Sequence, residues 1–304
     1  MRKKLFILEV LLAMILGAGT AIGQQISYSG SMQYATGSYF FEETTGSFLL
    51  SNGLSWSGER GGIAFSIPFI LQNSPWISYG GAGFIPTGGP QHQALRDSTG
   101  NRPGRGGKGM QGNMKSKADG VDAVTQTQGK GGNAVPIPDT SSYTESSFGD
   151  PSIYANLKLY NSSSGMTSVQ LNSGLKIPFA NPSSGFGTGE WDFGVGVSGL
   201  QRVSNYFLFI DLMKWWFGNM PDLELKNPFT YSLGLSRSFG SGWMVNTTFS
   251  GYTEIIEDYD PPMTLGFGVG YFVSDRVSLN SSCSVGLSES SADQAFGLGW
   301  SIKI

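Results

Sequence analysis

The chain is poor in the residues that build disulfides, metal sites and common catalytic centres. Its 304 residues include one cysteine, Cys283, and one histidine, His92. A single cysteine excludes an intramolecular disulfide and a cysteine-based zinc site, so we expect Cys283 to be a small residue on a strand. Without a second histidine or cysteine, a transition-metal site would have to be built from carboxylates. We predict no catalytic residue, no metal and no cofactor, and we expect His92 to be an exposed loop residue.

Charges and long apolar runs are also scarce. Charged residues make up 13% of the chain, whereas soluble domains usually carry ~25%, and a net charge of −3 is too close to neutral to indicate a nucleic-acid partner. Beyond the N-terminus no apolar run reaches the ~20 residues of a spanning helix. The longest, 207–217, is interrupted by Asp211 and Lys214. Such a chain can cross a membrane only as a closed β-barrel, because no other non-helical structure satisfies the backbone in lipid.

Glycine and aromatic residues, by contrast, are abundant. The chain contains 45 glycines, and aromatic residues make up 13% of it. A disordered chain would contain few aromatics. High glycine content, high aromatic content and low charge together indicate an all-β protein that faces an apolar solvent.

The N-terminus has the pattern of an export signal. Basic residues at positions 2–4 precede an apolar stretch at 5–16, which only Glu9 interrupts, and small residues follow. We predict a secretory signal peptide at 1–23 that is cleaved, leaving 24–304 as the mature barrel. A retained anchor helix is the alternative, although the apolar stretch is shorter than a spanning helix requires.

Segments with alternating apolar and small or polar residues recur between turns along the rest of the chain. In the last one, Phe296, Leu298 and Trp300 alternate with glycine and serine. Segments of about ten residues with this period of two are typical of transmembrane strands. We predict twelve strands at 27–39, 47–57, 62–71, 148–160, 167–178, 188–200, 205–217, 228–238, 242–252, 262–272, 276–287 and 293–303.

The connections between these strands alternate between long and short. Every odd-numbered connection is longer than its even-numbered neighbours. Long outside loops and short periplasmic turns are typical of an up-and-down antiparallel transmembrane β-barrel, whereas a soluble sandwich would bury the apolar face against a second sheet. An even number of strands places both chain ends on the periplasmic side. The segment 75–85 is an alternative thirteenth strand, which we assign to the preceding connection.

The longest connection, 72–147, is predicted to be a Gly-rich extracellular loop. From residue 86 onward it is rich in glycine, serine, threonine and glutamine and carries more basic than acidic residues. Such a composition buries too little apolar surface to order itself. The simplest interpretation is a mobile, solvated loop, and a plug folded partly into the lumen is the alternative.

Aromatic residues cluster near the predicted strand ends. Residues 39–41 and 215–217 end the first and seventh strands, and Trp56 and Trp243 lie near short turns. We interpret most of them as the aromatic girdles of a membrane barrel, with ordinary core packing as the alternative.

Several charged and large apolar residues are predicted to face the lumen. Twelve strands enclose a narrow lumen, in which charges either pair to brace the wall or line a polar path that tunes selectivity. The aromatic and methionine side chains on 205–217 suit a weakly polar solute. The lumen-lining candidates are Lys158, Lys176, Asp192, Asp211, Phe207, Phe209 and Met213.

One predicted loop, 253–261, is strongly acidic. Its carboxylates could ligate Ca²⁺ through oxygen, but the spacing matches no known loop motif, and a solvated acidic rim is the simpler interpretation. Such a rim would bias which solutes approach the mouth. The residues are Glu254, Glu257, Asp258 and Asp260.

Five short motifs carry a resemblance to a known family. They are Tyr34–Tyr39 (YATGSY), Phe148–Asp150 (FGD), Gly174–Pro178 (GLKIP), Gly187–Phe193 (GTGEWDF) and Gly286–Asp293 (GLSESSAD). Their order and content resemble the outer-membrane transporter-like β-barrel family named for the meta-pathway of phenol degradation.

The resemblance implies a fold and a function. It implies a twelve-stranded barrel of the Gram-negative outer membrane that takes up small hydrophobic or aromatic compounds passively, and it carries over no catalytic residue. Lipid, the solute and the barrel-assembly machinery are then the expected partners. The alternative is a non-transport barrel whose exposed loops bind a surface partner or ligand. Two departures from the family pattern are the long connection 72–147 and the C-terminal Ile304, where an aromatic residue is common.

Overall fold

The computed structural model describes residues 25–41, 44–74, 77–87, 144–180, 186–220 and 223–304. The predicted signal peptide at 1–23, His92 and most of the connection 72–147 lie outside these residues. Among the described residues, no helix is long and apolar enough to cross a membrane.

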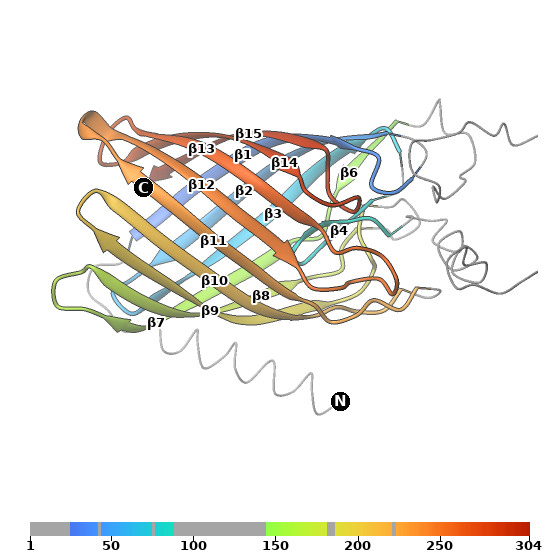
Figure 1. Ribbon diagram of the computed structural model, residues 1–304, viewed down its shortest axis with the longest axis horizontal. Helices are drawn as coiled ribbons and strands as arrows, with labels where there is room; N and C mark the ends of the chain where they lie inside the picture. Colours follow the sequence, from blue (N-terminus) through green and yellow to red (C-terminus); the bar gives the residue numbers. More distant parts are fainter. Residues whose placement is uncertain (1–24, 42–43, 75–76, 88–143, 181–185, 221–222) are drawn as a thin grey trace, which may run out of the picture.

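The strands form one closed antiparallel barrel (Figure 1). The sheet contains thirteen strands, of which β6 and β7 both pair with β3 and share one position, so the barrel has twelve positions. Each other strand pairs with its sequence neighbours, and pairing of the first with the last closes the ring. The strands are β1 (Gln25–Gly37), β2 (Thr45–Ser57), β3 (Gly61–Gln72), β6 (Glu145–Phe148), β7 (Ser152–Asn161), β8 (Thr167–Lys176), β9 (Asp192–Val203), β10 (Tyr206–Trp216), β11 (Phe229–Ser238), β12 (Trp243–Tyr252), β13 (Met263–Phe272), β14 (Val277–Gly286) and β15 (Gln294–Lys303).

The predicted twelve-stranded up-and-down barrel is confirmed, with one strand that is interrupted. The predicted strand 148–160 divides into β6 and β7 around residues 149–151. The break lies beside Pro68 of β3, which has no amide hydrogen to offer a partner strand. Instead, the amide of Gly149 donates to the carbonyl of Pro68 at 2.9 Å. The break leaves Asp150 outside the regular ladder.

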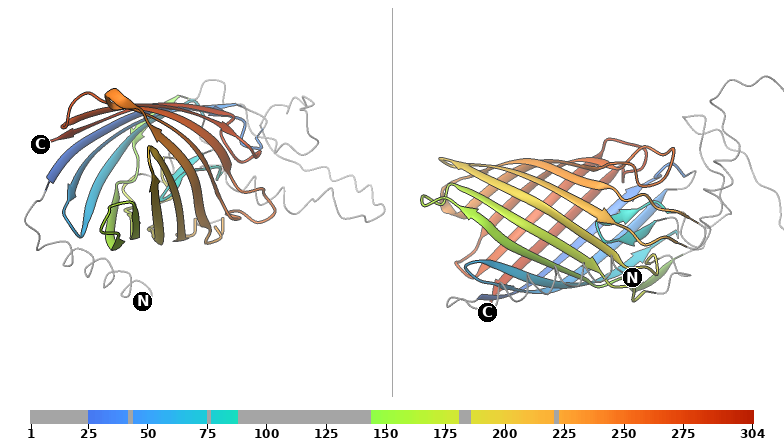
Figure 2. Two further views of the ribbon diagram at one scale, coloured as in Figure 1. Left: turned by 60° about the vertical axis from the view of Figure 1, so that its left-hand side comes forward. Right: turned by 90° about the horizontal axis from the view of Figure 1, so that it is seen from below.

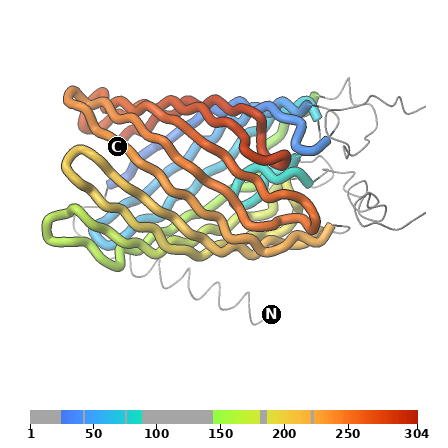
Figure 3. The backbone as a smooth tube through the Cα atoms, viewed as in Figure 1, coloured from blue at the N-terminus to red at the C-terminus, as the bar shows by residue number. Residues whose placement is uncertain are grey.

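The two ends of the barrel differ in their connections (Figures 1 and 3). At one end the strands are joined by turns of a few residues, one of which contains the short 3₁₀ helix η3 (Gly240–Gly242). The barrel's first and last strands also start and finish there, where the amide of Ile304 donates to the carbonyl of Ile26 at 2.9 Å. We call the adjacent part of the barrel the short-turn half and the opposite part the long-loop half.

Alternation along each strand separates two surfaces. The outward residues are mostly apolar, and many are exposed, as with Phe267 at 51% and Leu298 at 56%. The residues of the same strands that face the lumen are largely glycine, serine, threonine and asparagine. This arrangement suits a wall that contacts lipid on one side and water on the other.

The described residues 77–85 of the segment 75–85 do not join the barrel. Instead, β4 (Ser78–Gly80) and β5 (Gly83–Ile85) form a small hairpin of their own, which lies inside the long-loop half (Figures 1 and 2). The alternative of a thirteenth barrel strand is therefore wrong, and the hairpin belongs to the connection between β3 and β6, as assigned. The reason is apolar burial, since Ile77 and Ile85 are completely covered by the surrounding wall and loops.

The aromatic-girdle interpretation is wrong for four residues. Tyr39, Phe41, Trp215 and Phe217 are buried in a cluster inside the long-loop half rather than exposed toward lipid. Trp215 faces inward because it occupies one of the alternate positions along β10 whose side chains face the lumen. Near residue 40 the backbone has positive φ at two successive non-glycine positions, 49° at Tyr39 and 62° at the next. Trp243, in contrast, is exposed on the outer surface.

Candidate functional site

The lumen changes character along the barrel axis. In the long-loop half the lumen-facing residues are buried, whereas farther along the same strands they become partly exposed. On β10, Met213 and Trp215 are buried, but Phe207 and Phe209 are not. One half of the lumen is therefore filled, and the other half is open.

An apolar cluster fills the long-loop half. Its side chains come from the turn after β1, the β4–β5 hairpin, the end of β10 and two loops farther along the chain. Burial of these apolar side chains stabilises the packing of the hairpin and loops inside the wall. We call this cluster the plug, and its buried members are Tyr39, Phe41, Ile77, Ile85, Met213, Trp215, Phe217, Met220, Leu223, Leu225, Ile255 and Ile256.

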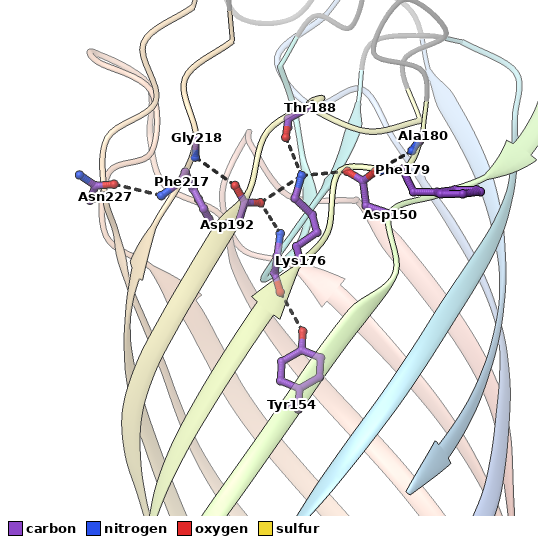
Figure 4. Close-up of polar contacts among 11 residues, drawn as sticks. Asp150, Tyr154, Lys176, Phe179, Ala180, Thr188, Asp192, Phe217, Gly218 and Asn227 are labelled. Atoms are coloured by element: carbon purple, nitrogen blue, oxygen red, sulfur yellow. Dashed lines mark hydrogen bonds and ion pairs between the residues drawn. The ribbon is translucent and has the colours of Figure 1, made fainter. Parts of the chain in front are cut away.

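A group of buried charges lies beside the plug (Figure 4). The ammonium of Lys176 lies 2.8 Å from a carboxylate oxygen of Asp150 and 3.3 Å from one of Asp192, and these three side chains are 0–1% exposed. Lys176 also donates to the hydroxyl of Thr188 at 2.6 Å. Buried charges are tolerated only when they are paired and hydrogen-bonded in this way.

The two carboxylates of this group also accept hydrogen bonds from loop backbones. One oxygen of Asp192 accepts the amide of Gly81 at 2.8 Å, and the other accepts the amide of Gly218 at 3.1 Å. Asp150 accepts the amides of Phe179 and Ala180, each at 2.8 Å. The charged group therefore holds the hairpin and two neighbouring loops against the wall, as Figure 4 shows.

Sequence reasoning identified two members of the charged group and missed the third. Lys176 and Asp192 were expected to face the lumen and are adjacent in register on β8 and β9. Asp150 was noticed only as part of the Phe148–Asp150 motif, because it lies where regular alternation stops. A glycine and a proline on either side of an aspartate, in the middle of a predicted strand, are the pattern that could have revealed it.

Polar cavities lie in the open part of the lumen that the described residues enclose. One, of about 360 Å³, lies in the short-turn half and is lined by residues such as Ser51, Ser278 and Asn280, with Met244 and Phe272 as apolar members. Another, of about 230 Å³, lies nearer mid-height and is lined mainly by serine, threonine and asparagine. Hydroxyl and amide groups therefore dominate the open surface.

The charges of the lumen are confined to one wall. In the described strands from β11 through β15 and on to β3, Lys303 at the very end of β15 is the one charged residue that faces inward. Strands β7 to β10 carry the others. Asp211 accepts a hydrogen bond from Asn172 at 3.3 Å, and Lys158 donates to the carbonyl of Gly58 at 3.4 Å near a short turn.

Two aromatic candidates and one unanticipated cation lie on the same wall. The guanidinium of Arg202 lies 5.4 Å from the ring centre of Phe207, a cation–π distance. The ring of Phe209 covers Gly234, whose missing side chain leaves room for it. Arg202 was not among the candidates because it lies beyond the predicted end of its strand.

The acidic residues of 253–261 lie outside the lumen. Glu254 and Glu257 are 2.6 Å and 3.8 Å from the ammonium of Lys226, and all three side chains are exposed. The hydrogen bond with Lys226 lowers the pKa of Glu254 and raises that of Lys226. Asp258 and Asp260 are also exposed. Within the described part of the chain, no group of three or more metal-ligating side chains is present.

A large recess among the described residues lies on the outer surface rather than in the lumen. It measures about 870 Å³, and its lining includes Met32, Phe267 and Leu298. Cys283, which is free and exposed, lies in the same recess. An apolar, outward recess of this kind is accounted for by contact with lipid chains.

A family model described as "Putative MetA-pathway of phenol degradation" matches residues 109–304. The chain belongs to this family. The match spans the barrel from before β6 to the C-terminus, and it confirms the resemblance drawn from the sequence motifs. No curated protein sequence matches the chain.

Solved structures share the barrel architecture. An outer membrane channel from Pseudomonas putida F1 superposes with a TM-score of 0.62 at 10% identity, covering 94% of this chain and 98% of that one. The KdgM porin gives 0.45 at 6% identity over 92% and 99% of the two chains. The CymD monoaromatic hydrocarbon channel gives 0.45 at 9% identity over 96% and 92%. The first likeness identifies the fold as that of an outer membrane β-barrel.

Proposed function

We propose that this barrel carries small, neutral solutes passively across the outer membrane, and that hydrophobic or aromatic compounds are among them. The observation that carries the proposal is the open, uncharged lumen wall of serine, threonine, asparagine and glycine. Hydroxyl and amide groups replace part of a solute's hydration without attracting ions of either sign. The family description, which refers to phenol degradation, supports an aromatic solute.

The size of the cavities favours small solutes. Volumes of about 360 Å³ and 230 Å³ are at or below the lower end of ordinary ligand pockets. Met244 and Phe272 in the larger cavity, with Phe207 and Phe209 on nearby strand β10, offer apolar contact to a ring. We therefore expect single-ring compounds to pass more readily than long chains or oligomers.

Swelling of proteoliposomes tests this function. The purified barrel is reconstituted, and swelling rates are compared for arabinose, phenyl glucoside and a benzoate salt at equal osmolarity. Neutral solutes should enter faster than the salt, and phenyl glucoside should compete with arabinose. Equal rates with and without protein, for every solute, both for the intact barrel and for a variant in which a short glycine–serine linker replaces 78–85, would exclude a channel. Growth on aromatic carbon sources, with and without the gene, then tests the role in cells.

The plug supports a second candidate function. Because apolar side chains fill the long-loop half, a barrel that does not transport and instead binds a surface partner through its loops is a distinct proposal. It predicts that deletion of 86–147 abolishes binding and leaves solute uptake unchanged. A loss of uptake with intact binding would contradict it.

Location and assembly follow from the same proposal. We propose that residues 1–23 direct export and are removed, that the barrel-assembly machinery inserts the chain, and that the short-turn half faces the periplasm. The proposal assigns no catalytic step to any residue. Protease treatment of intact cells tests the orientation, since cleavage should occur within 88–143 and not in the short turns.

A further inference from the structure

The β4–β5 hairpin is attached to the barrel differently from any barrel strand. It shares no backbone ladder with the wall. Its described hydrogen bonds to the wall run through side chains: Asp192 accepts its amide at Gly81, Tyr154 and Tyr252 donate to its carbonyls, and Gln72 donates to the carbonyl of Ile77. The hairpin can therefore leave without breaking a single hydrogen bond of the barrel ladder.

The charged group beside it depends on the hairpin for a complete set of partners. Asp150, Lys176 and Asp192 together carry two negative charges and one positive charge, all without contact to water. The amide of Gly81 is one of the donors that compensates the excess negative charge. Removal of that donor in a dry site would be costly. The seated hairpin supplies this donor, and water that enters in its place would supply another.

The desolvation cost of the buried charges also allows the hairpin to leave its position beside them. The desolvation cost of a buried ion pair offsets much of its Coulombic attraction, and lumen water would solvate Lys176 and both carboxylates once the hairpin moved. The hairpin can therefore leave without stranding these charges in a dry site. The hairpin is also attached by the hydrogen bonds from Tyr154, Tyr252 and Gln72 and by apolar contacts, among them those of Ile77 and Ile85 within the plug.

We propose that the segment 77–87 is a releasable gate, and that Asp150, Lys176 and Asp192 form the latch that holds it closed across the long-loop half. The gate governs the passage of solutes described under the proposed function, on which this inference rests. In the latched state the hairpin contributes Ile77 and Ile85 to the plug, and release of the hairpin widens the path from the long-loop end to the open cavities.

The latch is tested by ion conductance in planar bilayers, with Cys283→Ser as the background. Lys176→Met leaves two buried carboxylates uncompensated and should raise the ratio of open to closed channels by about a hundredfold. The matched control is Lys226→Met, which removes an exposed lysine that also lies between two carboxylates. The control should conduct like the background. Equal conductance of Lys176→Met and the control would overturn the latch.

A disulfide between the hairpin and the wall distinguishes an effect on gating from a loss of folding. A Cβ placed on Gly81 lies 2.9 Å from that of Asp192, which requires a shift of about 1 Å to reach disulfide geometry. The pair Gly81→Cys with Asp192→Cys should be closed when oxidised and open when reduced. Asp192→Cys alone should be open in both conditions. A double variant that conducts equally in both conditions, with the disulfide verified, would overturn the gate.

Replacement of 78–85 by a short glycine–serine linker distinguishes the two proposals. If the hairpin is a gate, this variant conducts and swells liposomes more than the background does. If neither protein passes ions or solutes while both retain the heat-dependent gel mobility of a folded barrel, the channel function itself fails. If both pass them equally, the channel stands and the gate is wrong.

Discussion

The two halves of the barrel are built from the same strands but are opposite in their interiors. In the long-loop half, large apolar side chains and three buried charges fill the lumen. In the short-turn half, glycine, serine and asparagine leave cavities. The backbone ladder runs continuously through both. The difference shows that the wall is a common scaffold and that the hairpin, loops and side chains packed inside it decide where the lumen is closed.

The largest effect on the difference between the two halves is expected from a substitution in the latch. Lys176→Met should lower the free energy of unfolding by about 3–5 kcal/mol, because two buried carboxylates lose their counter-charge. Urea-induced unfolding in detergent, followed by tryptophan fluorescence, measures it. The exposed Lys226→Met should change stability far less. If the two variants lose equal stability, the long-loop half is not the tightly packed region described here.

A second large effect is expected from the plug itself. Trp215 contacts the positions of Gly81, Gly174 and Gly194, which have no side chains in its way. Trp215→Ala should leave a cavity and cost about 3 kcal/mol. Trp243→Ala, at an exposed outer position, is the control and should cost much less. Thermal unfolding of the two variants compares them, and a larger loss for Trp243→Ala would contradict the assignment of the plug.

A smaller effect is expected from a charge placed on the uncharged wall. Asn280→Asp puts a carboxylate into the larger cavity and should slow neutral solutes a few-fold while shifting ion preference toward cations. Asn280→Ser keeps the wall neutral and serves as the control. Reversal potentials in a salt gradient report the shift. An unchanged reversal potential would mean that permeating ions do not pass this surface.

The smallest effect is expected at the exposed ion pair of the long-loop end. The pKa of Glu254 is lowered by Lys226. The stabilisation that ionised Glu254 gives the folded protein is therefore present above the ordinary pKa of glutamate, and it is lost as the pH falls through the lowered value. The pKa of Lys226 is raised, so its contribution is lost only as the pH rises above that value. The protease sensitivity of the loop 253–261 should be constant at neutral pH and increase only below about pH 4. Glu254→Gln should remove that acid dependence.

Regular features of the wall were accessible from sequence. Alternation along segments such as 293–303 identified the strands to within a few residues, because a surface between lipid and water enforces a period of two. The same alternation placed Lys176, Asp192 and Asp211 on the inward face. It also placed Phe207 and Phe209 there. These assignments depend only on local pattern and register.

The segments that fill the lumen could not be predicted from the sequence in the same way. The sequence of the hairpin at 78–85 is rich in turn residues and fits a barrel strand, an outside loop or a segment folded into the lumen equally well. Only tertiary contact with Ile77 and Trp215 decides among these three. Asp150 lies in a break of its strand, outside any periodicity. The aromatic residues at 39–41 match a girdle in composition, but their backbone turns them inward. Such features depend on distant partners that no local pattern records.

The contrast between the two halves is tested most directly by the access of water to single cysteines. In the Cys283→Ser background, Ser51→Cys lies in the open cavity and Ser78→Cys lies in the covered hairpin. A membrane-impermeant maleimide added to the reconstituted barrel should label position 51 rapidly and position 78 at least tenfold more slowly. Equal labelling of both positions, in barrels that retain their folded gel mobility, would contradict a lumen closed at one half and open at the other.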